Sequence, residues 1–170
     1  MSTWTDLSKW QKFLTQDGCP ICNQTPDSRP PTERTIVSLS ISRLVADRNT
    51  CLKGHCCLVS RPHAVELHDL SDEDSAAFMR DLRVASSALM KATDAIKLNY
   101  EIHGNTIPHL HMHLWPRHPG DRFDGEPIDW RTKTTDTYED GEFESFVETM
   151  KETLGIVEQG ADGDAATSAP

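Results

Sequence analysis

The feature that most constrains this chain is an alternation of histidines with apolar residues from His109 to Trp115, which reads His-Leu-His-Met-His-Leu-Trp. In a β-strand successive side chains point to opposite faces, so an extended backbone would place His109, His111 and His113 together on one face. A helix would spread the same three imidazoles around its circumference. Burying three imidazoles without partners would cost about 1–3 kcal/mol each. The pattern therefore predicts a strand that carries chemistry as well as structure.

Two chemical uses of such a strand remain open from the residues alone. In the first, two or three of the histidines bind a metal ion, as neighbouring histidines do in zinc hydrolases. In the second, one neutral imidazole attacks phosphorus while its neighbours hold the phosphate oxygens. The attacking ring needs one unprotonated nitrogen, and a hydrogen bond from its other nitrogen fixes that tautomer.

Composition limits the class of partner. The 170 residues are 36% hydrophobic, which suits one globular domain with a core. A net charge of −10 argues against a nucleic-acid surface and against binding to an anionic membrane. The chain has no run of 18 apolar residues, and its first residues lack a signal-peptide pattern, so we expect a cytoplasmic protein. Five cysteines suit reduced thiols or metal ligands better than a disulfide framework.

Local patterns predict an α+β domain in which an antiparallel sheet carries one long helix plus N- and C-terminal helices. Apolar residues at helical spacing predict helices over residues 4–14, 71–94 and 143–154. Alternating or compact apolar runs predict strands over residues 34–40, 42–46, 55–60 and 96–102 and through the histidines.

The domain is expected to span residues 1–158, with its core at about residues 34–118. Residues 159–170 are rich in Gly, Ala and acids, have little to bury, and are expected to form a disordered tail.

The histidine strand resembles the His-φ-His-φ-His-φ-φ signature (φ, apolar) of the histidine triad (HIT) nucleotide hydrolases and transferases, and the similarity runs from about Leu44 to Arg117. The resemblance implies a HIT-like fold, a nucleotide substrate and a homodimer. It implies that His111 forms a nucleotidyl-histidine intermediate and that His113 contacts the α-phosphate and its bridging oxygen. The implied enzyme hydrolyses a nucleoside phosphoramidate, a dinucleoside polyphosphate or a nucleotide ester at the α-phosphate, without a catalytic metal.

The resemblance also implies substrate-binding residues outside the triad. Asp47 stands where the family places the acid that accepts both ribose hydroxyls. Asn99, Asn105 and Thr106 fall where family members carry residues that contact phosphate. The family usually has glutamine at the position of Asn105, so the way in which the leaving group is held stays open. The alternative is that Asp47 is a turn residue and that Gly104 and Asn105 form a β-turn pair.

Cys19 and Cys22 form a Cys-x-x-Cys pair ahead of a proline-rich loop. Such a pair is either a redox motif or half of a zinc site, and the loop does not offer the βαβ context of a thioredoxin-like motif. Zinc-binding family members use two N-terminal cysteines, an upstream strand histidine and the first triad histidine. The resemblance thus implies a structural zinc held by Cys19, Cys22, His55 and His109, with free buried thiols as the alternative.

Three other functions stay open. A nucleotidyltransferase would pass the His111 adduct to a sugar phosphate or another acceptor, a zinc-dependent hydrolase would use the triad as metal ligands, and a binding module would hold nucleotide without turnover. Similarity of fold does not choose among them. His63, His68 and His103 stand isolated in the sequence and receive no role.

Overall fold

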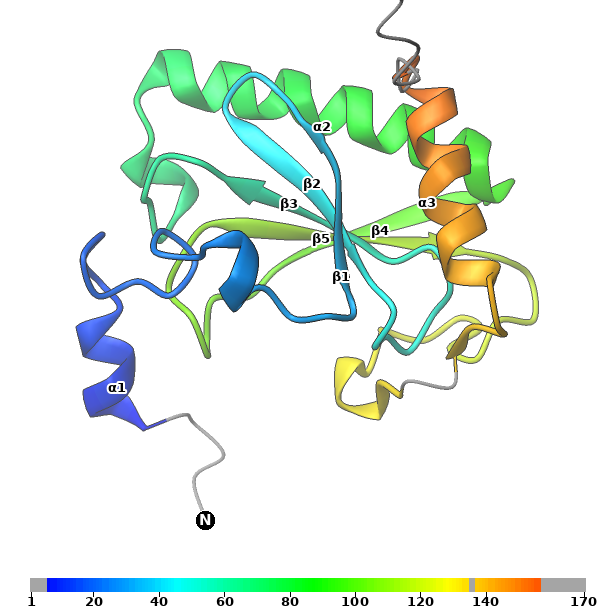
Figure 1. The fold of residues 1–170 in the computed structure, drawn as a ribbon, viewed down its shortest axis with the longest axis horizontal. Helices are drawn as coiled ribbons and strands as arrows, with labels where there is room; N and C mark the ends of the chain where they lie inside the picture. Colours follow the sequence, from blue (N-terminus) through cyan, green and yellow to red (C-terminus); the bar gives the residue numbers. More distant parts are fainter. Residues whose placement is uncertain (1–5, 135–136, 157–170) are drawn as a thin grey trace, which may run out of the picture.

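The computed structural model describes residues 6–134 and 137–156. One antiparallel sheet has its strands in the order β1-β2-β3-β5-β4 (Figure 1). The elements are β1 (Glu33–Ser38), β2 (Ser42–Asp47), β3 (Cys56–Ser60), β4 (Lys97–Ile102), β5 (His111–Arg117), α1 (Leu7–Lys12), α2 (Asp72–Thr93) and α3 (Glu142–Thr153). The predicted α+β class and its N-terminal, long and C-terminal helices are confirmed. The tail predicted over residues 159–170 lies outside the described residues.

Helices α2 and α3 cover one face of the sheet and bury the hydrophobic core against it (Figure 1). Phe78 and Leu89 of α2 and Phe143 of α3 are fully buried, as are Leu58 and Leu114 of the sheet. Burying each such side chain contributes about 1.5–3 kcal/mol. This packing leaves the opposite face of the sheet available for other use.

Asp81 is a charged residue that α2 turns toward the sheet, with 5% of its surface exposed. Its carboxylate accepts hydrogen bonds from the backbone N–H groups of Ser40, Ile41 and Ser42 and from both serine hydroxyls, over 2.7–3.1 Å. Burial by itself would raise the pKa of Asp81, but the hydrogen bonds from Ser42 and Ser40 outweigh it and lower that pKa. The carboxylate thereby fixes the β1–β2 turn to the long helix.

Strand β5 divides its side chains between the two faces as the alternation predicts. Met112 and Leu114 are buried in the core, whereas His111 and His113 are only partly buried on the face away from α2. Trp115 lies on that same face, because its side chain stacks on rings there.

His109 lies just before β5 rather than within it, because the strand begins at His111. Its backbone N–H donates to the carbonyl of Ile107 at 2.9 Å, inside the preceding turn. The prediction of one strand through all three histidines is therefore wrong for the first of them, whose ring is almost completely buried at 1% exposure.

Helix α1 is shorter than predicted, and part of the predicted range lies in residues 1–5, outside the described part of the chain. None of its residues is buried, and Leu7 is 55% exposed, so the described helix does not pack into the core. The indole N–H of Trp10 donates instead to the carbonyl of Gly104 at 2.9 Å, which ties α1 to the loop before β5. Of the helices in the described part of the chain, none has the length and apolar composition to cross a membrane.

Candidate active site

Strand pairing gathers side chains from four strands on the face opposite α2. Val45 on β2 pairs with Cys57 on β3, which pairs with His113 on β5, which pairs with Glu101 on β4. Cα partners in an antiparallel sheet place their side chains on the same face, about 4.5–5.5 Å apart. This row crosses the face of the sheet from β2 to β4.

A cavity of about 370 Å³ lies over this row. A volume of this size lies in the range of small-molecule sites. Its lining includes five residues proposed from the sequence as catalytic or substrate-binding, which are Asp47, Asn105, Thr106, His111 and His113, and also His55, which was proposed as a metal ligand.

Asn99 is not brought to this cavity. The partner of His113 on β4 is Glu101, so Asn99 lies one row further along, opposite Trp115. There it lines a separate shallow groove together with Arg117. The register of β4 thus contradicts the expectation that Asn99 binds substrate in this site.

His111 is held as a tautomer with one free nitrogen. Its Nδ1 lies 2.6 Å from the carbonyl oxygen of His109, which can only accept, so Nδ1 carries the proton. Burial lowers the pKa of His111, and the bond to the carbonyl opposes this only in part. The ring is then neutral near pH 7, with an unprotonated Nε2 that can act as a nucleophile.

His113 is paired with a histidine from another strand. Nε2 of His55 lies 3.0 Å from Nδ1 of His113, and the His55 ring stacks on Trp115 with centroids 3.7 Å apart. Burial lowers the pKa of His113 to about 3 and that of His55 well below its ordinary value. Both rings are neutral, so a single proton lies between them. When His55 donates it, His113 carries its own proton on Nε2, which can bind a phosphate oxygen.

Asp47 and the loop of Asn105 and Thr106 form other parts of the cavity wall. One oxygen of Asp47 accepts the backbone N–H of Asn49 at 2.9 Å, as in the turn that we gave as an alternative. This bond occupies one of the two carboxylate oxygens. The side chain therefore serves a turn and still borders the cavity.

Four residues outside the cavity floor form a compact group suited to a metal ion. The ligand atoms of Cys19, Cys22, His63 and His109 all lie within 4.8 Å of one another. Nδ1 of His109 lies 3.4 and 3.5 Å from the two sulfur atoms, and Nδ1 of His63 lies 3.3 Å from that of Cys22. Zinc bonds of about 2.3 Å to sulfur and about 2.0 Å to nitrogen at a tetrahedral angle separate such atoms by about 3.5 Å.

The second nitrogens of both imidazoles in this group have carbonyl partners. Nε2 of His109 lies 2.8 Å from the carbonyl oxygen of Ser60, and Nε2 of His63 lies 2.9 Å from that of Leu14. Each ring therefore carries its proton on Nε2 and turns an unprotonated Nδ1 toward the cysteines. Metal-bound histidines usually have this arrangement, so the donor set fits zinc.

The expected ligand His55 is replaced in this group by His63. Val59 of β3 pairs with His111, so the antiparallel register carries His109 past the end of β3, toward the residues that follow it. His55 lies at the other end of β3, beside His113. The placement of His55 in the metal group is therefore wrong. The sequence signal that could have identified His63 is its position three residues after the end of β3, the strand that pairs with β5.

Comparison with known proteins gives a consistent family and fold. A family model described as the HIT domain matches residues 32–120. The adenosine 5′-monophosphoramidase of Schizosaccharomyces pombe is 25% identical over 113 residues, which cover 66% of this chain and 82% of that protein. The adenosine 5′-monophosphoramidase of Saccharomyces cerevisiae is 26% identical over 128 residues, 72% of this chain and 73% of that protein.

Solved structures share the fold that the histidine strand led us to expect. A histidine triad protein from Bradyrhizobium japonicum has a TM-score of 0.65 at 26% identity, over 72% of this chain and 91% of that one. A zinc-bound histidine triad family protein from Mycobacterium smegmatis has a TM-score of 0.58 at 19% identity, over 83% of this chain and 96% of that one.

Proposed function

Because the chain belongs to the HIT domain family, we propose that it is an enzyme that hydrolyses nucleoside 5′-phosphoramidates at the α-phosphate, with His111 as its nucleophile. The observation that carries the proposal is the bond from Nδ1 of His111 to the His109 carbonyl, which leaves Nε2 unprotonated in a ring that lines the cavity. The two relatives named adenosine 5′-monophosphoramidases support the phosphoramidate as the substrate class.

The reaction proceeds in two steps at one phosphorus atom. Nε2 of His111 forms a bond to phosphorus as the bond from phosphorus to the departing nitrogen breaks, which gives a nucleotidyl-histidine. Water then attacks phosphorus, releases the nucleoside monophosphate and frees His111. Asp47 accepts the ribose hydroxyls, while His113 and the loop at Asn105 and Thr106 bind the phosphate oxygens. Each such charge-assisted hydrogen bond is worth about 1.5–3 kcal/mol.

The test is turnover of adenosine 5′-phosphoramidate by wild type and by His111→Ala. We expect the variant to lose at least about a thousandfold in kcat, since no other group replaces the nucleophile. His68→Ala is the matched control, because its imidazole is 84% exposed and does not line the cavity, and it should keep full activity. Near-normal activity of His111→Ala would show that the nucleophile is another group.

We further propose that Cys19, Cys22, His63 and His109 bind a structural zinc ion. Four protein ligands complete a tetrahedral shell, so such a site stabilises the fold and leaves no open position for substrate. It would tie the N-terminal segment to the residue that precedes β5. The nitrogen tautomers of both histidines and the ligand spacing support zinc in this group.

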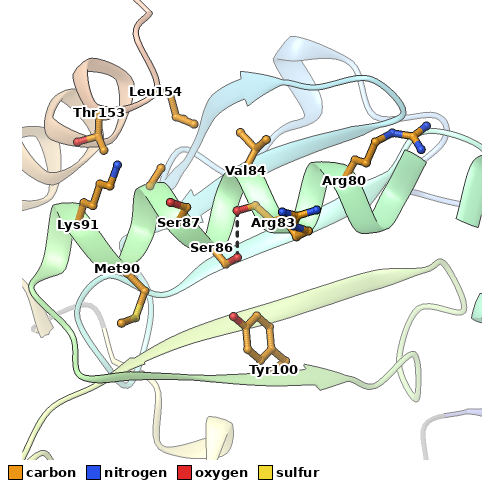
Figure 2. Close-up of a pocket in the computed structure, with 11 residues that line it drawn as sticks. Arg80, Arg83, Val84, Ser86, Ser87, Met90, Lys91, Tyr100, Thr153 and Leu154 are labelled. Atoms are coloured by element: carbon orange, nitrogen blue, oxygen red, sulfur yellow. Dashed lines mark hydrogen bonds between the residues drawn. The ribbon is translucent and has the colours of Figure 1, made fainter. Parts of the chain in front are cut away.

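We also propose a homodimer that forms along β4. This strand is at the edge of the sheet, so one side of its backbone is unpaired. Ile96, Tyr100 and Val84 are 69%, 46% and 48% exposed. Figure 2 shows Val84 and Met90 on α2 and Tyr100 on β4 around a shallow groove of about 770 Å³. Pairing of two β4 edges would cover these apolar groups.

A further inference from the structure

A carboxylate that the preceding scheme does not use orients a fourth imidazole at the cavity. Oε2 of Glu101 accepts the indole N–H of Trp115 at 3.1 Å and lies 3.1 Å from Nε2 of His103. The carboxylate is anchored to β5 through Trp115 and in turn orients a ring just past the end of β4. Because a carboxylate accepts, Nε2 of His103 carries a proton, and Nδ1 is left for a second one.

His103 lies close to the reacting groups. Its ring centroid is 5.3 Å from that of His113, which is 5.1 Å from that of His111, and all three rings line the same cavity. The next residue, Gly104, is held by the indole of Trp10 through its carbonyl. His103 is thus fixed on both sides, by Glu101 through its ring and by Trp10 through the neighbouring backbone.

The proposed reaction needs a proton at the departing nitrogen. An amine leaves phosphorus as a neutral molecule only when its nitrogen is protonated as the bond breaks. Nε2 of His111 is the attacking atom and has no proton to give, and burial lowers the pKa of His55 and His113, so these two rings are neutral at pH 7 and are weak acids. His103 is the least enclosed of the cavity imidazoles, with 36% of its side chain exposed, and has a carboxylate partner.

We propose that His103, oriented by Glu101, is the catalytic residue that protonates the departing nitrogen, an inference that rests on the proposed phosphoramidate hydrolysis. As Nε2 of His111 bonds to phosphorus and the phosphorus–nitrogen bond breaks, the proton on Nδ1 of the His103 imidazolium moves to the nitrogen. The amine leaves neutral, and His103 becomes neutral. When water attacks the adduct, its proton returns to Nδ1 of His103, the His111–phosphorus bond breaks, and both rings regain their starting forms.

If His103 is the general acid, the activity that a His103 variant retains should depend on the leaving group of the substrate. A departing alkylamine requires a proton, whereas p-nitrophenolate leaves as a stable anion and requires none. General acid catalysis by a positioned side chain contributes about 10²–10⁴-fold. Loss of His103 should therefore slow the first substrate and spare the second, which a merely structural role would not do.

The experiment compares His103→Gln with wild type on an adenosine 5′-phosphoramidate of an alkylamine and on the p-nitrophenyl ester of AMP. We expect kcat to fall about a hundredfold or more on the phosphoramidate and less than about threefold on the ester. The ester also reports whether the variant is folded. Glu101→Gln, which can still accept from Trp115, should lose about tenfold on the phosphoramidate only. His118→Gln is the control, because its ring also binds a carbonyl but lies outside the cavity, and it should match wild type.

Equal losses on both substrates, or no loss on the phosphoramidate, would overturn the role of His103 while leaving the proposed function intact. If wild type hydrolyses neither substrate, the proposed function fails, and the role of His103 fails with it. The two failures are therefore distinguished by the wild-type rates.

Discussion

At the scale of the residue, the hydrogen-bond partner of one ring nitrogen determines which role the other nitrogen of each histidine can have. A carbonyl oxygen on Nδ1 frees Nε2 of His111, whereas carbonyl oxygens on Nε2 free Nδ1 of His109 and His63. A carboxylate oxygen of Glu101 accepts from Nε2 of His103 and orients that ring. In the proposed scheme the same type of side chain serves as nucleophile, metal ligand or acid, because its hydrogen bonds differ.

The metal group yields a prediction about zinc content that distinguishes His55, just before β3, from His63, just after it. Purified wild type and His55→Ala should each contain one zinc ion per chain, whereas His63→Ala should lose it, since of these two histidines His63 is the one that turns an unprotonated nitrogen toward the cysteines. Elemental analysis measures the content. Cys19→Ser should behave as His63→Ala does. Zinc lost from His55→Ala but kept by His63→Ala would restore the ligand set expected from the sequence.

The protonation of His111 yields a prediction about pH. Burial lowers the pKa of His111, so the neutral nucleophile persists to a lower pH than for a free imidazole, whose pKa is about 6.5. With the p-nitrophenyl ester, which needs no acid, kcat/KM should stay constant as pH falls to about 6.5 and decline only below it. A decline centred above that pH would mean that His111 is not shifted in this direction.

At the scale of the element, Asp81 yields a prediction about stability. Asp81→Asn removes a charged acceptor from five hydrogen bonds, so the free energy of unfolding at pH 7 should fall by about 1–3 kcal/mol in urea denaturation. The folded pKa of Asp81 is lowered, so its contribution is complete above the unfolded pKa of about 3.9 and is lost as pH falls through the folded pKa. The difference between wild type and variant should shrink over that interval. The exposed control Glu73→Gln should change stability by less than about 0.5 kcal/mol, and an equal effect would contradict the anchoring role of Asp81.

Elements with a local signal could be predicted from the sequence. Helix α2 begins after Ser71, whose hydroxyl accepts the N–H of Asp74, and ends at the left-handed Asp94, which agrees with the range 71–94 that apolar spacing indicated. The alternation of β5 likewise assigned His111 and His113 to one face. In both cases the information lies within a few neighbouring residues.

Features that depend on register between distant strands could not be predicted in this way. Asn99 lies one row away from the cavity because of the register between β4 and β5. His63, and not His55, lies near His109 because of the register between β3 and β5. His103 has no periodic pattern around it, and only its contact with Glu101 reveals it. The local sequence indicates the type of each side chain and the face of the strand on which it lies. Which residues of different strands come into contact depends on the long-range strand pairing.

At the scale of the whole molecule, the hydrophobic core and the candidate active site lie on opposite faces of one sheet. Its α2 face holds the core, and its other face holds the cavity, whose lining includes Ile21 of the N-terminal segment and Trp130. The chain carries a net charge of −10, yet its proposed substrate is an anion. Arg43 and Lys133 line the cavity together with the acids Glu33 and Asp47, so its lining does not share the acidic excess of the whole chain.

The exposed edge of the sheet yields a prediction about assembly. Wild type should be a dimer in size-exclusion chromatography with light scattering, and Tyr100→Glu should be a monomer, because each carboxylate would be buried against its copy in a paired β4 interface. Leu67→Glu is the control, since Leu67 is 41% exposed on a short 3₁₀ turn before α2, and it should remain a dimer. A monomeric wild type, or a dimeric Tyr100→Glu, would exclude this interface.

The proposed mechanism requires a covalent adduct on His111, which can be detected by mass spectrometry. Enzyme in excess over adenosine 5′-phosphoramidate is quenched in alkaline denaturant during a single turnover, and the intact mass and the peptide that contains His111 are measured. We expect an added AMP group on that imidazole in wild type and none in His111→Ala, which should also fail to release AMP. An unmodified His111 together with full turnover by His111→Ala would contradict this mechanism.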